Sequence, residues 1–307
     1  MTFRSGFASR LAATAAALGA LTTNAFAAMG HPTDWQIGLQ GAATSIARQV
    51  SQFNFFITII IALIVIFVMV LLAIVMVRFN ARANPTPSRT THHNVLEIVW
   101  TIVPVVILVV IAVPSFRLLF AEYDMPQPYL TIRAVGHQWF WSYDYEKNNP
   151  KSLEEVAKSA ATDANAAFSF NSILVQDKDL KPGQPRLLTV DNEVVVPVGK
   201  VVRVLVTGAD VIHSFAVPSF AIKADAVPGR LQEVWFKADR EGTYYGQCSE
   251  LCGQNHAFMP IVIRVVNQQE YENWLTEAKK RFADAAPARP AGRMLAAADP
   301  APSAAVR

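Results

Sequence analysis

Two long apolar runs dominate the N-terminal 120 residues of the chain. Phe53–Val77 and Val95–Phe120 each supply about 25 largely apolar residues, whereas a helix needs only ~20 to cross the hydrocarbon core of a bilayer. The pattern therefore predicts two transmembrane helices, at residues 53–78 and 95–120, that form a hairpin.

A shorter apolar stretch lies at the N-terminus. Residues 1–27 contain Arg4 and Arg10, an Ala/Leu-rich centre and the small-residue ending Ala25-Phe26-Ala27, which is the pattern of a cleaved export signal. A first transmembrane helix is the alternative, although the stretch is short for a span. Residues 28–52 would then be an exported N-terminal segment.

The connection between the two long runs, residues 79–94, is basic. It follows Arg78, contains Arg82 and Arg89, and has no acidic residue. Because cytoplasmic loops are enriched in Lys and Arg, this loop is predicted to be cytoplasmic. Both ends of the hairpin then face outward, which agrees with the export signal and places everything after about Tyr123 outside the cytoplasm.

Beyond the second run, short β-rich segments are separated by turn residues. Six strands are predicted: Tyr129–Val135, Trp139–Tyr145, Leu187–Val190, Val201–Thr207, Leu231–Phe236 and Ile261–Val266. Several of them alternate apolar and polar positions, and Val201–Val206 is apolar enough to be a buried strand. Short strands at this spacing are typical of a β-sandwich or barrel.

Three further segments differ from this rhythm. Residues 148–170 are predicted to be a surface insertion, partly helical. Residues 268–284 are predicted to form an amphipathic helix, and residues 285–307 an Ala/Pro-rich tail that is mobile or processed. The apolar face of the helix would consist of Tyr271, Trp274, Leu275 and Ala278.

The net charge of +3 conceals a division along the chain. Residues 121–285 contain 17 Lys and Arg against 21 Asp and Glu, whereas the remainder contains 10 against 3. The exported domain is therefore acidic, which favours a basic soluble partner and disfavours nucleic acid. Ordinary surface charge is the alternative interpretation of this count.

The chain's only cysteines, Cys248 and Cys252, lie in a short segment rich in metal donors. His256 and Met259 follow closely, and His213 precedes the segment by 35 residues. Soft sulfur combined with imidazole is a ligand set for copper or zinc, and does not suit calcium or magnesium. The segment is therefore a candidate metal centre.

The second cysteine favours two copper ions over one. A mononuclear blue-copper centre uses one Cys, two His and a weak axial Met, whereas two thiolates can bridge a copper pair. His213 and His256 could each bind one of the two copper ions. Met259 and a main-chain oxygen such as that of Glu250 could be their weak axial donors. Sharing one electron over a rigid core would permit fast electron transfer.

Three alternatives to a copper pair stay open at this point. Cys248 and Cys252 could form a disulfide in an oxidising compartment. Two Cys and two His could hold one tetrahedral zinc ion. His213 on its own could be a histidine of the hydrophobic core.

Several motifs resemble subunit 2 of the haem-copper cytochrome c oxidases. They are Gly136-His-Gln-Trp-Phe-Trp-Ser-Tyr143, Asp210-Val-Ile-His-Ser-Phe-Ala-Val-Pro-Ser219, Lys223-Ala-Asp-Ala-Val-Pro-Gly-Arg230 and the cysteine segment Cys248–Met259. The resemblance extends over about residues 52–282. The signal, the insertion and the tail lie outside it and resemble those of bacterial members.

The resemblance implies a fold and a location. The fold would be a two-helix transmembrane hairpin plus an all-β cupredoxin-like Greek-key barrel at residues 121–267. The chain would lie in the bacterial inner membrane, with the copper domain on the periplasmic side.

The family pattern also implies metal ligands. A binuclear copper centre, CuA, would be held by His213, Cys248, Cys252, His256, Met259 and the main-chain oxygen of Glu250. The Glu250 side chain would bind a magnesium ion at the boundary with subunit 1, since carboxylates suit this hard cation. A solvated loop acid is the alternative for that side chain.

Trp139 matches the tryptophan through which electrons enter in that family, an exposed ring against which the haem edge of cytochrome c docks. The barrel core is the alternative, and it is the expected place of Phe140 and Trp141. The acids that match the docking surface are Asp144, Glu154, Asp191 and Asp210. A solvated surface charge is the alternative for each of these acids.

Glu97 lies near the cytoplasmic start of the second span, where a buried carboxylate is costly and suggests a function. It resembles the acid at the entrance of a proton path that leads through subunit 1. A glutamate stabilised by the dipole at a helix N-terminus is the alternative. The preceding His92 and His93 receive no role.

The implied function is that of subunit 2 of an aerobic respiratory cytochrome c oxidase. Such a subunit accepts electrons from cytochrome c and passes them to haem in subunit 1, where oxygen is reduced to water and protons are pumped. The chain alone would reduce no oxygen. Expected partners are cytochrome c, subunit 1, subunit 3 and membrane lipid, with two copper ions and magnesium as cofactors.

Two other functions compete with this interpretation. A quinol oxidase subunit would have the same fold without the metal, but Cys248, Cys252 and Met259 would then have no purpose. A membrane-tethered copper-delivery protein would be marked by exposed Met/His-rich tracts, which the sequence lacks.

Overall fold

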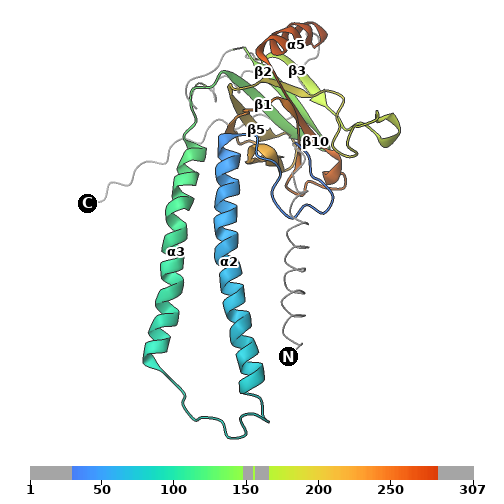
Figure 1. Ribbon diagram of the computed structural model, residues 1–307. Helices are drawn as coiled ribbons and strands as arrows, with labels where there is room; N and C mark the ends of the chain where they lie inside the picture. Colours follow the sequence, from blue (N-terminus) through green and yellow to red (C-terminus); the bar gives the residue numbers. More distant parts are fainter. Residues whose placement is uncertain (1–29, 148–154, 156–165, 283–307) are drawn as a thin grey trace, which may run out of the picture. The chain divides into compact units, whose positions relative to one another are not determined.

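The computed structural model describes residues 30–147, 155 and 166–282. The predicted export signal, most of the predicted insertion and the predicted tail lie outside the described residues. The chain divides into two compact units, Ile46–Pro126 and a second unit that combines Met1–Ser45 with Gln127–Arg307. Figure 1 shows both units.

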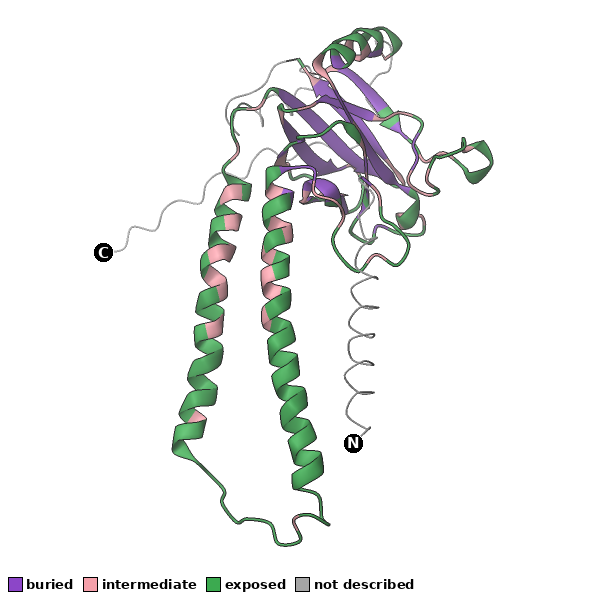
Figure 2. Cartoon of the chain, viewed as in Figure 1, coloured by how far each residue is buried: buried purple, intermediate pink, exposed green. Residues whose placement is uncertain are grey.

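The first unit consists of two helices, α2 (Ser45–Arg78) and α3 (Asn94–Tyr123). Both are long and apolar enough to cross a membrane; most of their side chains are exposed, the others are half-buried, and only Ala47 is buried (Figure 2). At 1.5 Å per residue α3 is about 45 Å long, which is the thickness of a bilayer with its headgroups. The protein is a membrane protein with an extramembrane domain.

His93 and Glu97 cap the start of α3. The His93 ring nitrogen Nδ1 accepts a hydrogen bond from the Leu96 amide at 3.2 Å, and Glu97 Oε1 accepts one from the His93 amide at 3.1 Å. This reciprocal pair resembles a capping box, with the acid one position later than in the usual motif. His93 therefore has a structural role that the sequence did not indicate, and the Glu97 carboxylate is hydrogen-bonded at the helix N-terminus.

The second unit is built on two five-stranded sheets that enclose one hydrophobic core. The first sheet has the order β3 (Ala166–Ser172), β2 (Phe140–Glu146), β1 (Leu130–His137), β5 (Val201–Gly208) and β8 (Gln232–Lys237). The second has the order β4 (Val194–Pro197), β10 (Pro260–Val266), β9 (Gly242–Cys248), β6 (His213–Val217) and β7 (Ile222–Ala226). Short 3₁₀ helices lie at Asp177–Asp179 (η1), Pro218–Phe220 (η2) and His256–Phe258 (η3).

Strands β1 and β5 pair in parallel, as do β10 and β4, and the other pairs are antiparallel. Aromatic rings on alternate positions of β2 point into the core, where Trp141, Tyr143 and Tyr145 are almost completely buried. The predicted fold, a two-helix hairpin plus an all-β cupredoxin-like domain, is confirmed.

The structure corrects two local predictions. The predicted strand 187–190 is not formed: residues 186–188 are a turn in which Leu187 is left-handed (φ 63°), and the Thr189 hydroxyl donates to the Pro185 carbonyl at 2.9 Å. Val190 makes only an isolated β-bridge, to Leu174. Residues 166–170, assigned to the surface insertion, belong to β3. This strand pairs with β2 and buries Phe168 and Phe170.

Helix α5 (Gln268–Arg281) covers part of the core. Asn267 caps it by accepting a hydrogen bond from the Glu270 amide at 3.0 Å. Tyr271 and Ala278 are buried, and the Trp274 ring lies 5.2 Å from that of Tyr145. The apolar face that the sequence indicated is therefore the face that packs.

Candidate metal centre

Three strands of the second sheet bring the predicted donors to one end of the domain. Strand β6 runs antiparallel to β9, with Phe215 opposite Cys248, so the start of β6 meets the end of β9. Strand β10 is also antiparallel to β9 and begins at Pro260. His213 is the first residue of β6, and Met259 directly precedes β10. The connection between β9 and β10 therefore closes over His213.

The two cysteines are close but not bonded. Their sulfur atoms are 3.8 Å apart and both thiols are free, whereas a disulfide has an S–S distance of about 2.05 Å. Two metal–sulfur bonds of about 2.3 Å each can span up to about 4.6 Å. The separation of Cys248 and Cys252 thus fits thiolates that share metal ions and does not correspond to the disulfide alternative.

Each sulfur has one imidazole nitrogen and one weaker donor beside it. Cys248 Sγ lies 3.9 Å from His213 Nδ1 and 3.3 Å from the Glu250 main-chain oxygen. Cys252 Sγ lies 3.5 Å from His256 Nδ1 and 3.5 Å from Met259 Sδ. His213, both cysteines and Met259 are buried. All six predicted copper donors are therefore brought together.

The donors do not converge on one point. The ligand atoms of His213, Cys248 and Cys252 lie within 4.8 Å of one another, and among the described residues His256 does not join that group. Donors of a single zinc ion lie at most about 4.6 Å apart. A single tetrahedral ion bound by both histidines fits this arrangement less well than two neighbouring metal positions.

The two thiols differ in their affinity for protons. Burial raises the pKa of Cys248, but hydrogen bonds from His213 and from backbone amides outweigh it and lower the pKa to about 6. Burial and the adjacent Cys248 charge raise the pKa of Cys252 to about 12. Because metal binding requires both sulfurs as thiolates, it is accompanied by release of protons from this pair.

Asp210 fixes the orientation of His213. Its carboxylate accepts hydrogen bonds from His213 Nε2 at 2.8 Å, the Gln138 amide at 2.7 Å and the Val211 amide at 2.6 Å. Burial raises the pKa of Asp210, but these hydrogen bonds outweigh it and the net shift is downward. Holding Nε2 in this way leaves Nδ1 directed at Cys248, as carboxylates behind histidine ligands do.

The turn between β1 and β2 lies against the cysteine loop. Gln138 Nε2 and Trp139 Nε1 both donate to the main-chain oxygen of Cys252, at 2.9 Å and 3.3 Å. Trp139 is half-buried. The ring predicted to receive electrons is therefore hydrogen-bonded to the backbone of a candidate ligand.

Trp141 and Gly136 form the inner wall of the site. Trp141 is completely buried, donates from Nε1 to the Met259 carbonyl at 3.3 Å, and lies edge-on to His213 with ring centres 6.1 Å apart. A Cβ atom at Gly136 would lie 2.8 Å from the His213 ring. Sequence reasoning had placed Trp141 in the core and had not assigned either residue to the site.

The predicted docking acids differ in their exposure to solvent. Asp210 and Asp191 are exposed, and Glu154 lies outside the described residues. Asp144 is a correction: only 3% of it is exposed, because the β1–β2 register places it opposite Arg133, with which it forms an ion pair at 2.7 Å. A carboxylate buried in this way cannot contact a partner directly.

Two families match the chain. The model for cytochrome c oxidase subunit II, periplasmic domain, matches residues 130–266, and that for cytochrome c oxidase subunit II, transmembrane domain, matches residues 32–118. A similar solved structure is the crystal structure of the periplasmic domain of subunit II of cytochrome oxidase of Bradyrhizobium japonicum. It is 53% identical and covers 52% of this chain and 99% of that chain, with a TM-score of 0.42.

Relatives of full length are similar over most of the chain. The probable cytochrome c oxidase subunit 2 of Rickettsia bellii is 43% identical over 86% of this chain and 91% of its own length. Cytochrome c oxidase subunit 2 of Cereibacter sphaeroides is 42% identical over 94% of this chain and 95% of its own length. Since both family models and these relatives extend over the helices and the β domain alike, the chain belongs to the cytochrome c oxidase subunit II family.

Proposed function

We propose that the chain is the electron-accepting subunit of a proton-pumping, haem-copper cytochrome c oxidase. The observation that carries this proposal is the pair of sulfurs 3.8 Å apart, each beside one imidazole nitrogen and one weak donor. The proposed copper ligands are His213, Cys248, Cys252, His256, Met259 and the Glu250 main-chain oxygen. When bound, two copper ions would supply a one-electron centre that changes little in geometry on oxidation.

The residues around the ligands support a rigid site. Asp210 holds the His213 ring, and Trp141 holds the backbone of Met259. Burial of His213, both cysteines and Met259 keeps water away from the donors. Ligands held in this way need little rearrangement when an electron arrives, which favours fast transfer.

Trp139 is the proposed point at which electrons from cytochrome c enter. Apolar side chains at Val211, Ile212 and Leu251 are exposed next in sequence to Asp210 and Glu250, and they suit close contact with a haem edge. Asp191 and Asp210 would attract the lysine-rich surface of cytochrome c, an attraction that weakens with salt.

Other proposals concern neighbouring subunits. The exposed Glu250 side chain would bind magnesium at the boundary with subunit 1, and electrons would continue to haem there. Glu97, in the first turn of α3, would lie at the entrance of a proton path. Residues 1–27 would be the export signal, residues 79–94 would face the cytoplasm, and the β domain would lie on the periplasmic side of a bacterial inner membrane.

Metal analysis tests the central proposal. The full chain, purified in detergent and loaded anaerobically, should contain two copper ions and show mixed-valence bands in the near infrared. The quinol oxidase alternative predicts no copper, and a delivery protein predicts copper that is readily lost to a chelator. One copper, a single zinc ion or a Cys248–Cys252 disulfide would contradict the proposal.

Met259→Leu should retain copper and shift its reduction potential. Leucine keeps the volume of the buried side chain but removes the sulfur that lies 3.5 Å from Cys252 Sγ, and a weak axial ligand tunes potential more than affinity. Redox titration followed at the near-infrared bands measures the shift. Wholesale loss of copper would mean that Met259 is a principal ligand.

A further inference from the structure

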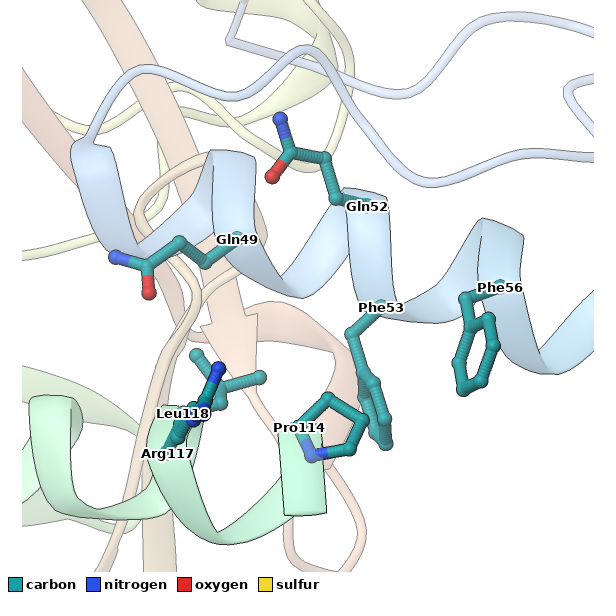
Figure 3. Close-up of a pocket in the computed structure, with 7 residues that line it drawn as sticks. All are labelled: Gln49, Gln52, Phe53, Phe56, Pro114, Arg117 and Leu118. Carbon is teal, nitrogen blue, oxygen red and sulfur yellow. The ribbon is translucent and has the colours of Figure 1, made fainter. Parts of the chain in front are cut away.

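A hollow of about 350 Å³ lies between α2 and α3, within the unit that the two helices form. Figure 3 shows that its two ends differ in chemistry. Gln49, Arg117 and Leu118 lie toward one end, and Phe53, Phe56 and Pro114 lie toward the other. The polar end is nearer the start of α2 and the end of α3, and the apolar end is nearer the middle of both helices.

The exposure of the lining residues follows the same division. Gln49 and Arg117 are exposed, whereas Phe53, Phe56 and Pro114 are half-buried. The hollow therefore has a polar, cationic rim and an apolar floor that leads toward the centre of the membrane. A molecule that fills it must have a polar end at the membrane surface and an apolar part below.

The depth of Arg117 identifies the polar end. It precedes the end of α3 at Tyr123 by six residues, or about 9 Å, and α3 is as long as a bilayer with its headgroups is thick. Arg117 thus lies near the boundary between headgroups and hydrocarbon. An arginine near a helix end extends its guanidinium to the membrane surface, where lipid phosphates are the nearest anions, and in the part of the chain that the structure describes Arg117 forms no ion pair.

We propose that the hollow binds one acidic phospholipid. The guanidinium of Arg117 would hold the phosphate through paired hydrogen bonds, a geometry for which arginine is well suited, and the Gln49 amide would donate another. An acyl chain would lie along Phe53, Phe56 and Pro114. The proposal needs only the membrane-spanning helices and does not depend on copper.

The purified oxidase complex provides the test. Native mass spectrometry would count the phosphatidylglycerol molecules that survive detergent washing. Complexes with the unchanged chain should retain one more molecule than complexes with Arg117→Gln, and added phosphatidylglycerol should rebind about fivefold more weakly to this variant. Arg117→Lys, which keeps the charge, should recover most of the binding.

Arg48→Gln is the matched control, because Arg48 lies in the first turn of α2 and does not line the hollow. This variant should bind lipid like the unchanged chain, and equal copper content in all variants would show that the complexes are assembled. Equal retention by the unchanged chain and Arg117→Gln would overturn the proposal. The proposal would also be overturned if phosphatidylcholine bound as tightly as phosphatidylglycerol, or if inorganic phosphate displaced the bound lipid. A helix of another subunit found in the hollow would overturn it as well.

Discussion

Trp139→Ala is expected to slow electron uptake from reduced cytochrome c by about 100-fold, which corresponds to about 2.7 kcal/mol in activation free energy. The Trp139 ring is half-buried and donates a hydrogen bond at 3.3 Å to the main-chain oxygen of Cys252. Alanine would leave a gap of several ångströms between a docked haem edge and the cysteine loop. Stopped-flow mixing of the oxidase with reduced cytochrome c measures the rate.

The variant should not disturb the metal ligands directly, because the hydrogen bond of the Trp139 ring goes to the main-chain oxygen of Cys252 and not to a ligand atom. Copper content and the salt dependence of docking should therefore stay unchanged. Phe140→Leu is the matched control: Phe140 is also half-buried, but its ring stacks on His137 at 4.5 Å, so electron uptake should stay near normal. An unchanged rate in Trp139→Ala would remove Trp139 from the electron path.

The sequence predicted most of the elements whose signal is local, although β4, which contains three valines in a row, was missed. Strands β1, β2, β5, β8 and β10 are rich in β-branched or aromatic residues, and two long apolar runs mark α2 and α3. In contrast, β9 contains two glycines and several polar residues, and β6 begins with His213 and Ser214. These strands exist because pairing within the sheet outweighs weak intrinsic propensity, which no local pattern records.

The candidate site also has parts that could be predicted from the sequence and parts that could not. Its six donors could be predicted because five of them lie within a dozen positions and belong to specific motifs. The supporting contacts could not, because they join segments distant in sequence: the Gln138 amide reaches Asp210 across 72 positions. Asp144 was assigned to the surface for the same reason, since its pairing with Arg133 follows from strand register. An acid three positions before a candidate ligand, as Asp210 is before His213, is a signal that could have been used.

Gly136→Ala is expected to lower the copper affinity of the site by about 100-fold, at the upper end of the effect of disturbing the groups that orient a metal ligand. The added Cβ would lie 2.8 Å from Cγ and Cδ2 of His213, too close for either group to stay in place. Strand β1 cannot easily move away from His213, because Gly136 pairs with Trp141 of β2 on one side and with Gly208 of β5 on the other. The His213 ring would therefore move, and its Nδ1 would no longer face Cys248.

Copper per chain at limiting metal and the near-infrared spectrum measure this loss, and circular dichroism shows whether the β domain is intact. Gly38→Ala is the control, since nothing lies within 4 Å of the Cβ it would add, and it should load copper normally. If the Gly136→Ala protein were folded and bound both copper ions with an unchanged spectrum, the contact between β1 and His213 would not be what positions the ligand. The positioning would then rest on Asp210 alone, whose hydrogen bond to Nε2 holds the opposite side of the ring.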